Sequence, residues 1–253
     1  MLKSILFAGV ASILVAFPAQ AKEWKEIKIA TEGAYPPFNF VAADGSLQGL
    51  DVEIAKALCA AMEAKCEIVA NDWDGMIPGL QANKFDAVIA SMSVTEERQK
   101  QVSFTDKYYS TPLSVAVPKD SPITALGAEA FKGKSIGAQG STTQATYAED
   151  VYGKAGADVK LYPTADEANA DLKSGRLDAV ISDKFPISDW IKGDGGECCK
   201  LIGDVPGTQT DTAIAVRKDD NDLREQFNAA IKKIREDGTY ATVVKKYFDF
   251  DIY

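Results

Sequence analysis

Short apolar runs bounded by turn residues alternate along this chain with stretches of helical periodicity. Runs typical of buried strands occur at 26–30, 66–70, 87–90, 113–118, 134–138, 159–162, 179–182 and 212–216. Between them, 52–64 carries apolar residues four positions apart, and further helices are expected at 165–173, 221–235 and 240–248. Strands that alternate with helices in this way predict an α/β fold with mostly parallel sheets flanked by helices.

One apolar run occurs twice with related surroundings. Residues 86–91 read DAVIAS and residues 178–183 read DAVISD, and each copy follows a polar helix end. Aligning the copies places Ser91 opposite Asp183. The repeat predicts two related halves, each with a polar group at the end of an equivalent strand, and two facing lobes of opposite local charge suit a zwitterion.

The first copy continues into a loop suited to an anion. Ser91, Ser93 and Thr95 follow the predicted strand directly, and Arg98 stands one helical turn later. Ligands bind beyond the carboxyl ends of strands in open α/β sheets, and the planar fork of arginine matches a carboxylate. In the simpler interpretation Ser93 and Thr95 only cap a helix and Arg98 is solvated. The second copy of the element argues against it.

Three further loops at strand ends offer candidate ligand contacts. Glycine and paired prolines in TEGAYPPF end the first strand and present Glu32 and Tyr35. Trp73 lies in the polar stretch NDWDG, where it can form half of an aromatic clamp. QGSTTQ opens a helix with the hydroxyls of Ser141 and Thr142. Purely structural roles remain possible for three of these residues. Glu32 could be a surface acid, Tyr35 could fill the edge of the core, and Trp73 could cover the helix that follows it.

The first residues have the pattern of a secretory signal peptide. Lys3 precedes thirteen mostly apolar residues, 5–17, and Ala19-Gln20-Ala21 follows, which predicts cleavage after Ala21. The run is shorter than the roughly 20 residues of a membrane span. We therefore expect residues 1–21 to be removed and the mature chain to be soluble and exported.

The composition of the chain argues against several classes of binding partner. The 253-residue chain has a formal charge of −9 at pH 7, which becomes −10 without Lys3 of the leader. An acidic chain without a basic cluster argues against nucleic acid or anionic lipid and is compatible with a cationic ligand. There is no histidine, and the cysteine spacing fits no zinc pattern, so neither a metal nor another cofactor is expected.

Four cysteines in an exported chain are expected to be oxidised. Cys59 and Cys66 end a predicted helix and begin the next strand, a separation that can bring two Cα atoms within bridging distance, and we expect that bridge. Cys198 and Cys199 are adjacent, so free thiols and a strained vicinal disulfide both remain open. Four cysteines allow three pairings, and the sequence alone does not choose among them.

The chain resembles the periplasmic amino-acid-binding proteins of ABC importers, in particular the lysine/arginine/ornithine-binding type of solute-binding protein family 3. The resemblance covers essentially the whole mature chain and rests, in order, on TEGAYPPFNF, GLDVEIAKALC, DWDGMIPGL, SMSVTEERQ, QGSTTQATYAED, GRLDAVISD and DGTYATVVKKYF. It implies a type II periplasmic-binding-protein fold with two crossover segments: 22–111 plus 210–253 as lobe 1 and 112–209 as lobe 2. It also implies a periplasmic monomer whose partners are an amino-acid ligand and a membrane ABC permease.

The resemblance also implies roles for single residues. The family's carboxylate-clamping arginine falls on Arg98, and its ammonium-binding aspartate falls on Asp183. The full set of expected ligand-binding residues is Glu32, Tyr35, Trp73, Ser91, Met92, Ser93, Arg98, Ser141, Thr142 and Asp183. No catalytic residue is expected.

Departures from the family pattern affect the side-chain end of the pocket. Ala90 stands where close relatives have a serine, Glu32 replaces an aspartate that reads a cationic side chain, and Trp73 replaces phenylalanine or leucine. One carboxylate between two aromatic faces favours arginine, followed by ornithine and lysine. Opines and other guanidino compounds are the alternative ligands. If the aromatic residues only wall off a polar pocket, glutamine or histidine is expected instead.

Two other functions compete with a solute receptor. Cyclohexadienyl dehydratases resemble this family, and such an enzyme needs a general acid in the cleft. Only carboxylates such as Glu32 or Asp183 could serve, and both already have binding roles, so we expect no enzyme. A ligand-sensing partner of a receptor kinase would act only through a separate protein.

Overall fold

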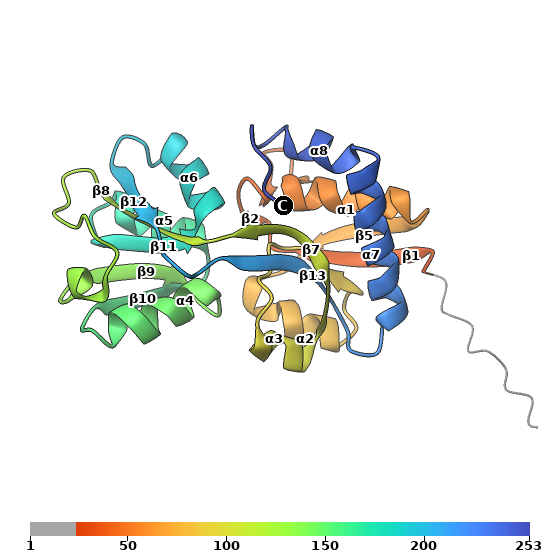
Figure 1. Cartoon of the computed structure of the whole chain (residues 1–253), viewed down its shortest axis with the longest axis horizontal. Coiled ribbons are helices and arrows are strands. Elements are labelled where there is room, and N and C mark those ends of the chain that lie inside the picture. Colours follow the sequence, from red (N-terminus) through yellow and green to blue (C-terminus); the bar gives the residue numbers. More distant parts are fainter. Residues whose placement is uncertain (1–23) are drawn as a thin grey trace, which may run out of the picture.

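The computed structural model describes residues 24–253, so the predicted signal peptide and its cleavage site lie outside the described part. The chain forms two five-stranded mixed sheets that lie side by side, each with helices on both faces (Figure 1). We call the part built on the first sheet lobe 1 and the part built on the second sheet lobe 2. Both have the predicted α/β character.

The sheet of lobe 1 has the order β5-β1-β6-β13-β7. Its strands, in that order, are Lys65–Ala70, Glu26–Thr31, Ala87–Val88, Thr210–Val216 and Ser103–Thr111. The sheet of lobe 2 has the order β10-β9-β11-β8-β12, with strands Asp158–Tyr162, Ser135–Gln139, Ala179–Asp183, Leu113–Pro118 and Cys199–Asp204. A small sheet in lobe 1 contains β2 (Ala34–Tyr35), β3 (Asn39–Val41) and β4 (Leu47–Gln48).

Helices cover the sheets because successive strand residues point to opposite faces. In lobe 1 one core joins α1 (Leu50–Ala61), α7 (Asn221–Glu236) and α8 (Thr239–Val244) to one face, and α2 (Met76–Gln81) packs on the other. The short α3 is Glu96–Gln101. In lobe 2, α5 (Ala165–Lys173) and α6 (Lys184–Lys192) share one core, and α4 (Thr143–Tyr147) lies in another. Single turns occur at Trp73–Gly75 and Ala128–Phe131, and a π-helix at Ala148–Gly153.

The repeated sequence forms equivalent strands. β6 pairs in parallel with β1 and antiparallel with β13, and β11 pairs in parallel with β9 and antiparallel with β8. The first aspartate of each copy has the same structural role: Asp86 Oδ2 accepts from the Lys28 amide at 3.0 Å, and Asp178 Oδ2 accepts from the Ser135 amide at 2.9 Å. Each carboxylate thus fixes its strand to the neighbouring parallel strand.

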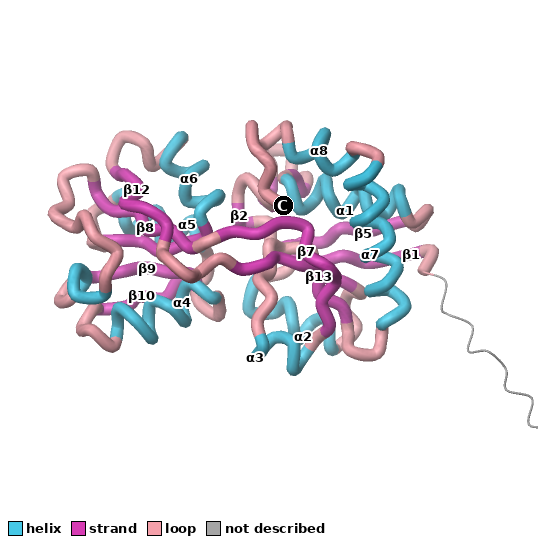
Figure 2. Tube along the Cα trace, viewed as in Figure 1, coloured by secondary structure: helices cyan, strands magenta, loops and turns pink. Residues whose placement is uncertain are grey.

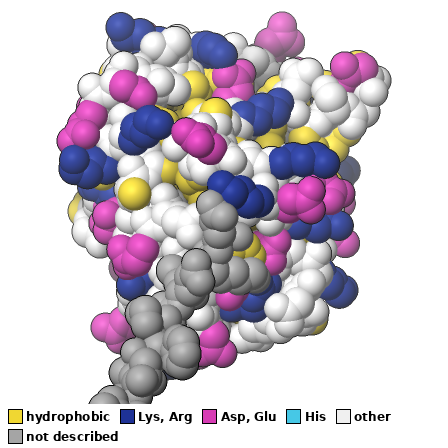
Figure 3. Space-filling view, turned by 90° about the vertical axis from the view of Figure 1, so that its right-hand side faces the viewer, with side chains coloured by type: hydrophobic (Ala, Val, Ile, Leu, Met, Phe, Trp, Pro, Cys, Tyr) yellow, Lys and Arg dark blue, Asp and Glu magenta, His cyan; other side chains and the backbone are white. Residues whose placement is uncertain are grey.

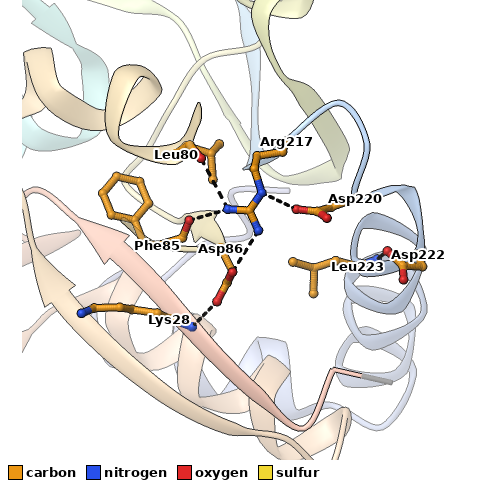
Figure 4. Close-up of polar contacts among 8 residues, drawn as sticks. All are labelled: Lys28, Leu80, Phe85, Asp86, Arg217, Asp220, Asp222 and Leu223. Atoms are coloured by element: carbon orange, nitrogen blue, oxygen red, sulfur yellow. Dashed lines mark hydrogen bonds and ion pairs between the residues drawn. The ribbon is translucent and has the colours of Figure 1, made fainter. Parts of the chain in front are cut away.

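Each of these aspartates also pairs with a cation: in lobe 2 Lys134 lies 3.3 Å from Asp178, and in lobe 1 the partner of Asp86 is Arg217 (Figure 4). Its guanidinium pairs with Asp86 at 2.9 Å and with Asp220 at 2.6 Å, and it donates to the Phe85 carbonyl at 2.7 Å. These groups come from the start of β6 and from the turn after β13. Arg217 therefore joins the start of β6 to the turn after its neighbouring strand β13, and it does not line the cavity between the lobes.

Two chain segments connect the lobes, and they run next to each other (Figure 2). β7 continues through Pro112 into β8, and the chain returns through 205–209 into β13. The connecting segments pair where they meet, with Thr111 opposite Thr210 and Ser110 opposite Asp211. Such paired crossovers are typical of hinges between lobes.

Several predicted element boundaries are corrected by the structure. Helix α1 begins at Leu50 with Gly49 as its N-cap, so Asp51 lies in the first turn and is not the predicted cap. Gly49 has φ 116°, and a side chain there would collide with the Phe38 carbonyl, so glycine is required. Helix α8 ends at Val244 and not at 248, and β6 is shorter than the predicted strand 87–90.

Both pairs of cysteines form disulfides. Cys59 of α1 and Cys66 of β5 are joined with a Cα–Cα distance of 6.1 Å, which confirms the predicted bridge. Cys198 and Cys199 form a vicinal disulfide at the start of β12, which answers the question that the sequence left open.

The visible end of lobe 1 carries interspersed basic and acidic side chains (Figure 3). No helix within residues 24–253 is long and apolar enough to cross a membrane.

Candidate functional site

A small cavity lies between the lobes. Every predicted ligand-binding residue except Met92 and Ser141 lines it. The lining residues are Glu32, Tyr35, Trp73, Ala90, Ser91, Ser93 and Arg98 of lobe 1, and Gln139, Thr142, Thr143, Gln144 and Asp183 of lobe 2.

Hydrogen bonds between side chains of the two lobes close the cavity. Tyr35 Oη donates to Asp183 Oδ2 at 2.7 Å, and Gln139 Nε2 donates to Glu32 Oε1 at 2.6 Å. A third bond joins the lobes through the backbone: Trp73 Nε1 donates to the Ser141 carbonyl at 3.1 Å. These contacts require the lobes to be together, so the structure shows a closed arrangement.

Asp183 presents an unpaired carboxylate oxygen at the end of β11. The residue is only 2% exposed, and Oδ1 has no hydrogen-bond partner among the described residues, whereas Oδ2 accepts from Tyr35. Burial raises the pKa of Asp183 to about 6. An unsatisfied buried acceptor is costly to maintain, and an ammonium group would satisfy it.

Arg98 presents the matching cation from lobe 1. Thr95 caps α3 by accepting from the Arg98 amide at 3.2 Å, which fixes the first turn. The guanidinium donates to the Ser93 carbonyl at 2.8 Å and to the Ser141 carbonyl at 3.2 Å, and it lies 5.2 Å from the centre of the Trp73 ring. It makes no ion pair with any described residue, so its charge is available to an anion. Burial lowers the pKa of Arg98 to about 10, which leaves it charged at neutral pH.

A buried network holds Ser91 in place behind the cavity wall. Ser91 has φ 53°, a left-handed conformation that is uncommon for residues other than glycine. Asp51 accepts from Ser91 Oγ at 2.9 Å, from Tyr108 Oη at 2.7 Å and from Asn39 Nδ2 at 2.8 Å. Burial raises the pKa of Asp51 to about 6. Asp51 therefore orients the loop after β6 instead of capping a helix.

The far end of the cavity is acidic. Glu32 follows β1, and burial raises its pKa to about 7, while the hydrogen bond from Gln139 opposes that shift. Tyr35 and Trp73 also line the cavity. A positively charged group there would gain a carboxylate partner and aromatic neighbours.

Met92 and Ser141 lie beside this cavity and not in its wall. Both line a neighbouring groove, and the Met92 side chain is buried in a core of lobe 1. Ser141 contributes its carbonyl, which accepts from Trp73 and Arg98, and it also has a left-handed φ of 57°.

Sequence reasoning missed Gln139, Thr143 and Gln144, which line the cavity. All three belong to the QGSTTQ stretch, in which only Ser141 and Thr142 are expected from the sequence to contact a ligand. Thr142 caps α4 by accepting from the Ala145 amide at 3.1 Å, as expected of a residue that opens a helix. Within residues 24–253, no group of carboxylates and cysteines has a metal-binding arrangement.

Two α/β lobes joined by paired crossover segments and closed over a small charged cavity define the class of two-lobed solute-binding proteins. Residues 27–250 match the family model of bacterial extracellular solute-binding proteins, family 3, and the chain belongs to this family.

Individual relatives agree with this assignment. An L-arginine-binding protein of Pseudomonas aeruginosa is 38% identical over 100% of this chain and 99% of its own length. The lysine/arginine/ornithine-binding periplasmic protein of Escherichia coli K12 is 36% identical over 100% of this chain and 99% of its own length. An ancestral arginine-binding protein bound to arginine superimposes with a TM-score of 0.84 at 36% identity, covering 90% of this chain and 100% of that structure.

Proposed function

We propose that this chain is a periplasmic receptor that captures a cationic amino acid between its lobes and delivers it to a membrane ABC permease. Arginine is the favoured ligand, followed by ornithine and lysine. The observation that carries the proposal is the buried Asp183, whose Oδ1 lacks a partner in a cavity that also contains the unpaired guanidinium of Arg98. This pair of opposite charges matches the two ends of an α-amino acid.

The proposed orientation of the ligand follows from these charges. The α-ammonium group binds Asp183 of lobe 2, and the α-carboxylate binds Arg98 of lobe 1. The side chain then extends towards Glu32, with Tyr35 and Trp73 along its path. Arginine is favoured over lysine because a guanidinium is planar, stacks on aromatic rings and is more weakly hydrated than an ammonium group.

The proposal includes the remaining assignments that the fold suggests. Lobe 1 comprises 22–111 and 210–253, and lobe 2 comprises 112–209. These bounds are proposed because the chain passes from the first sheet to the second near Pro112 and returns within 205–209. The mature protein begins after Ala21 and acts as a monomer. Relatives are named as binding proteins, and no catalytic role is assigned to Glu32 or Asp183, since each is needed as a ligand contact.

Isothermal titration calorimetry with a panel of ligands tests this function. The panel contains arginine, ornithine, lysine, citrulline, glutamine, histidine and octopine, with prephenate and arogenate as turnover controls. We expect the tightest binding for arginine and no turnover. A ligand at 100 times its dissociation constant should also stabilise the fold by about 2.7 kcal/mol in a thermal-shift assay. Tighter binding of glutamine or citrulline than of arginine would refute the preference for a cation.

A further inference from the structure

Gln139 occupies the acidic end of the cavity and reaches Glu32 from the opposite lobe. It ends β9, is 6% exposed, and donates from Nε2 to Glu32 Oε1 at 2.6 Å and to the Pro163 carbonyl at 3.1 Å. A carboxamide nitrogen carries two hydrogens, so both are used in these bonds. Nε2 therefore has no donor left for a ligand.

The remaining polar side-chain atoms of Gln139 and Glu32 are acceptors. No donor among the described residues reaches Gln139 Oε1 or Glu32 Oε2, while both residues line the cavity. Guanidinium and ammonium groups only donate hydrogen bonds and match such a surface. The ureido group of citrulline and the carboxamide of glutamine carry a carbonyl oxygen, which would face these acceptors without a donor.

The same hydrogen bond keeps Glu32 suited to a cation. Burial is the largest cause of the raised pKa of Glu32. The charges of Asp166 from lobe 2 and of Asp72 and Asp74 from lobe 1 raise it further. The bond from Gln139 lowers it. Without this bond the carboxyl group would hold its proton to higher pH and would be a weaker partner for a positive charge.

We propose that Gln139 is a specificity-determining residue: it fixes Glu32 across the closed cleft as an acceptor and, with its own Oε1, favours head groups that carry hydrogen-bond donors and no acceptor. This inference rests on the proposed function and deepens it, because it makes the amide of lobe 2 part of the selection for a positive charge.

A double-mutant cycle with Gln139→Met and Glu32→Gln tests the proposal. Methionine preserves length and removes both hydrogen bonds. The quantity measured by calorimetry at pH 7.5 is the ratio of the dissociation constants of citrulline and arginine. We expect Gln139→Met to lower this ratio about tenfold and to add little in the Glu32→Gln background, because both changes remove one shared interaction. Gln81→Met is the matched control: among residues 24–253, the side chain of Gln81 in α2 bonds only to the Gln101 carbonyl, which lies outside the cavity, so the ratio should stay at the wild-type value.

A pH profile separates this role from a structural one. In Gln139→Met, the pH below which arginine affinity declines should move upward, since the bond that lowers the Glu32 pKa is gone. If Gln139→Met does not fold, the shorter Gln139→Asn, which does not span both acceptors, tests the same ratio.

The possible results are distinct. A ratio within about threefold of wild type in the Gln139 variant, or full additivity in the double variant, would overturn this inference alone. A wild-type protein that does not prefer arginine to citrulline would overturn both the inference and the proposed function.

Discussion

Asp183→Asn should abolish most of the affinity for every amino acid that the protein accepts. The carboxylate is 2% exposed and has one oxygen without a partner, so the bound ammonium group would be desolvated opposite a neutral amide. Breaking a buried charge pair by removing one partner costs roughly 3 to 5 kcal/mol. At 1.4 kcal/mol per decade this corresponds to a loss of affinity of about two to three and a half decades.

The ligand-free variant should be at least as stable as the wild type. Burial raises the pKa of Asp183 to about 6, because the bond from Tyr35 and the charge of Arg98 offset the loss of solvent around the carboxylate only in part. An asparagine of similar shape removes that cost, so thermal unfolding without ligand should not occur at lower temperature. Lost affinity together with retained stability distinguishes a binding role from a structural one.

Calorimetry with arginine, ornithine and lysine measures the effect. All three should weaken to a similar extent, because Asp183 is expected to contact the part of the ligand that they share. Asp189→Asn in α6 is the matched control, since Asp189 does not line the cavity, and its affinities should equal those of the wild type. A loss of less than about threefold in Asp183→Asn, or a loss for one ligand only, would refute the assignment.

Three further outcomes are expected. Arg98→Ala should weaken all accepted amino acids by at least a hundredfold without changing their order; a change of selectivity with affinity kept within about threefold would contradict its role as carboxylate clamp. Because burial raises the pKa of Glu32 to about 7, the ionised carboxylate that a cation needs is lost as the pH falls through 7. Arginine affinity should therefore decrease by up to tenfold per pH unit below that value, whereas a flat profile would argue against an ion pair. Replacing Cys59 and Cys66 together by serine should lower the free energy of unfolding by about 2 to 3 kcal/mol in chemical denaturation, with ligand affinity unchanged, since the bridge closes a short loop away from the cavity.

The sequence predicted the architecture and most of the cavity because both follow from local patterns. The DAVI repeat predicts two equivalent strands even when it is not known which strands pair with them in the sheets. The structure places the two copies at equivalent positions in the two sheets. Tyr35, Trp73 and Asp183 could be found because each lies at or within a few residues of the end of a strand, where the backbone itself delivers side chains to the cleft.

Residues that act through long-range partners could not be found in this way. Asp51 has the sequence position of a helix cap, and only the packing of α1 against the loop after β6 turns it towards Ser91, forty residues later in the chain. Gln139 reads as the last residue of a strand, and its contact with Glu32 spans 107 residues and two lobes. Neither partner choice is encoded in spacing or periodicity.

The two lobes hold their parts of the cavity by different means. In lobe 1 the left-handed Ser91 is fixed by Asp51 and Tyr108, which are buried in the same lobe and are present whether the cleft is open or closed. In lobe 2 the left-handed Ser141 has its carbonyl bonded by Trp73 and Arg98, which belong to lobe 1. A residue in a strained conformation costs of order 1 to 3 kcal/mol, so surrounding contacts must hold it. Lobe 1 is therefore preorganised, and the closed cleft adds contacts at Ser141 that lobe 2 alone does not supply. This division predicts that the ligand docks first on lobe 1, which carries the proposed carboxylate clamp, and that closure then adds Asp183 and the bond by which Gln139 fixes Glu32.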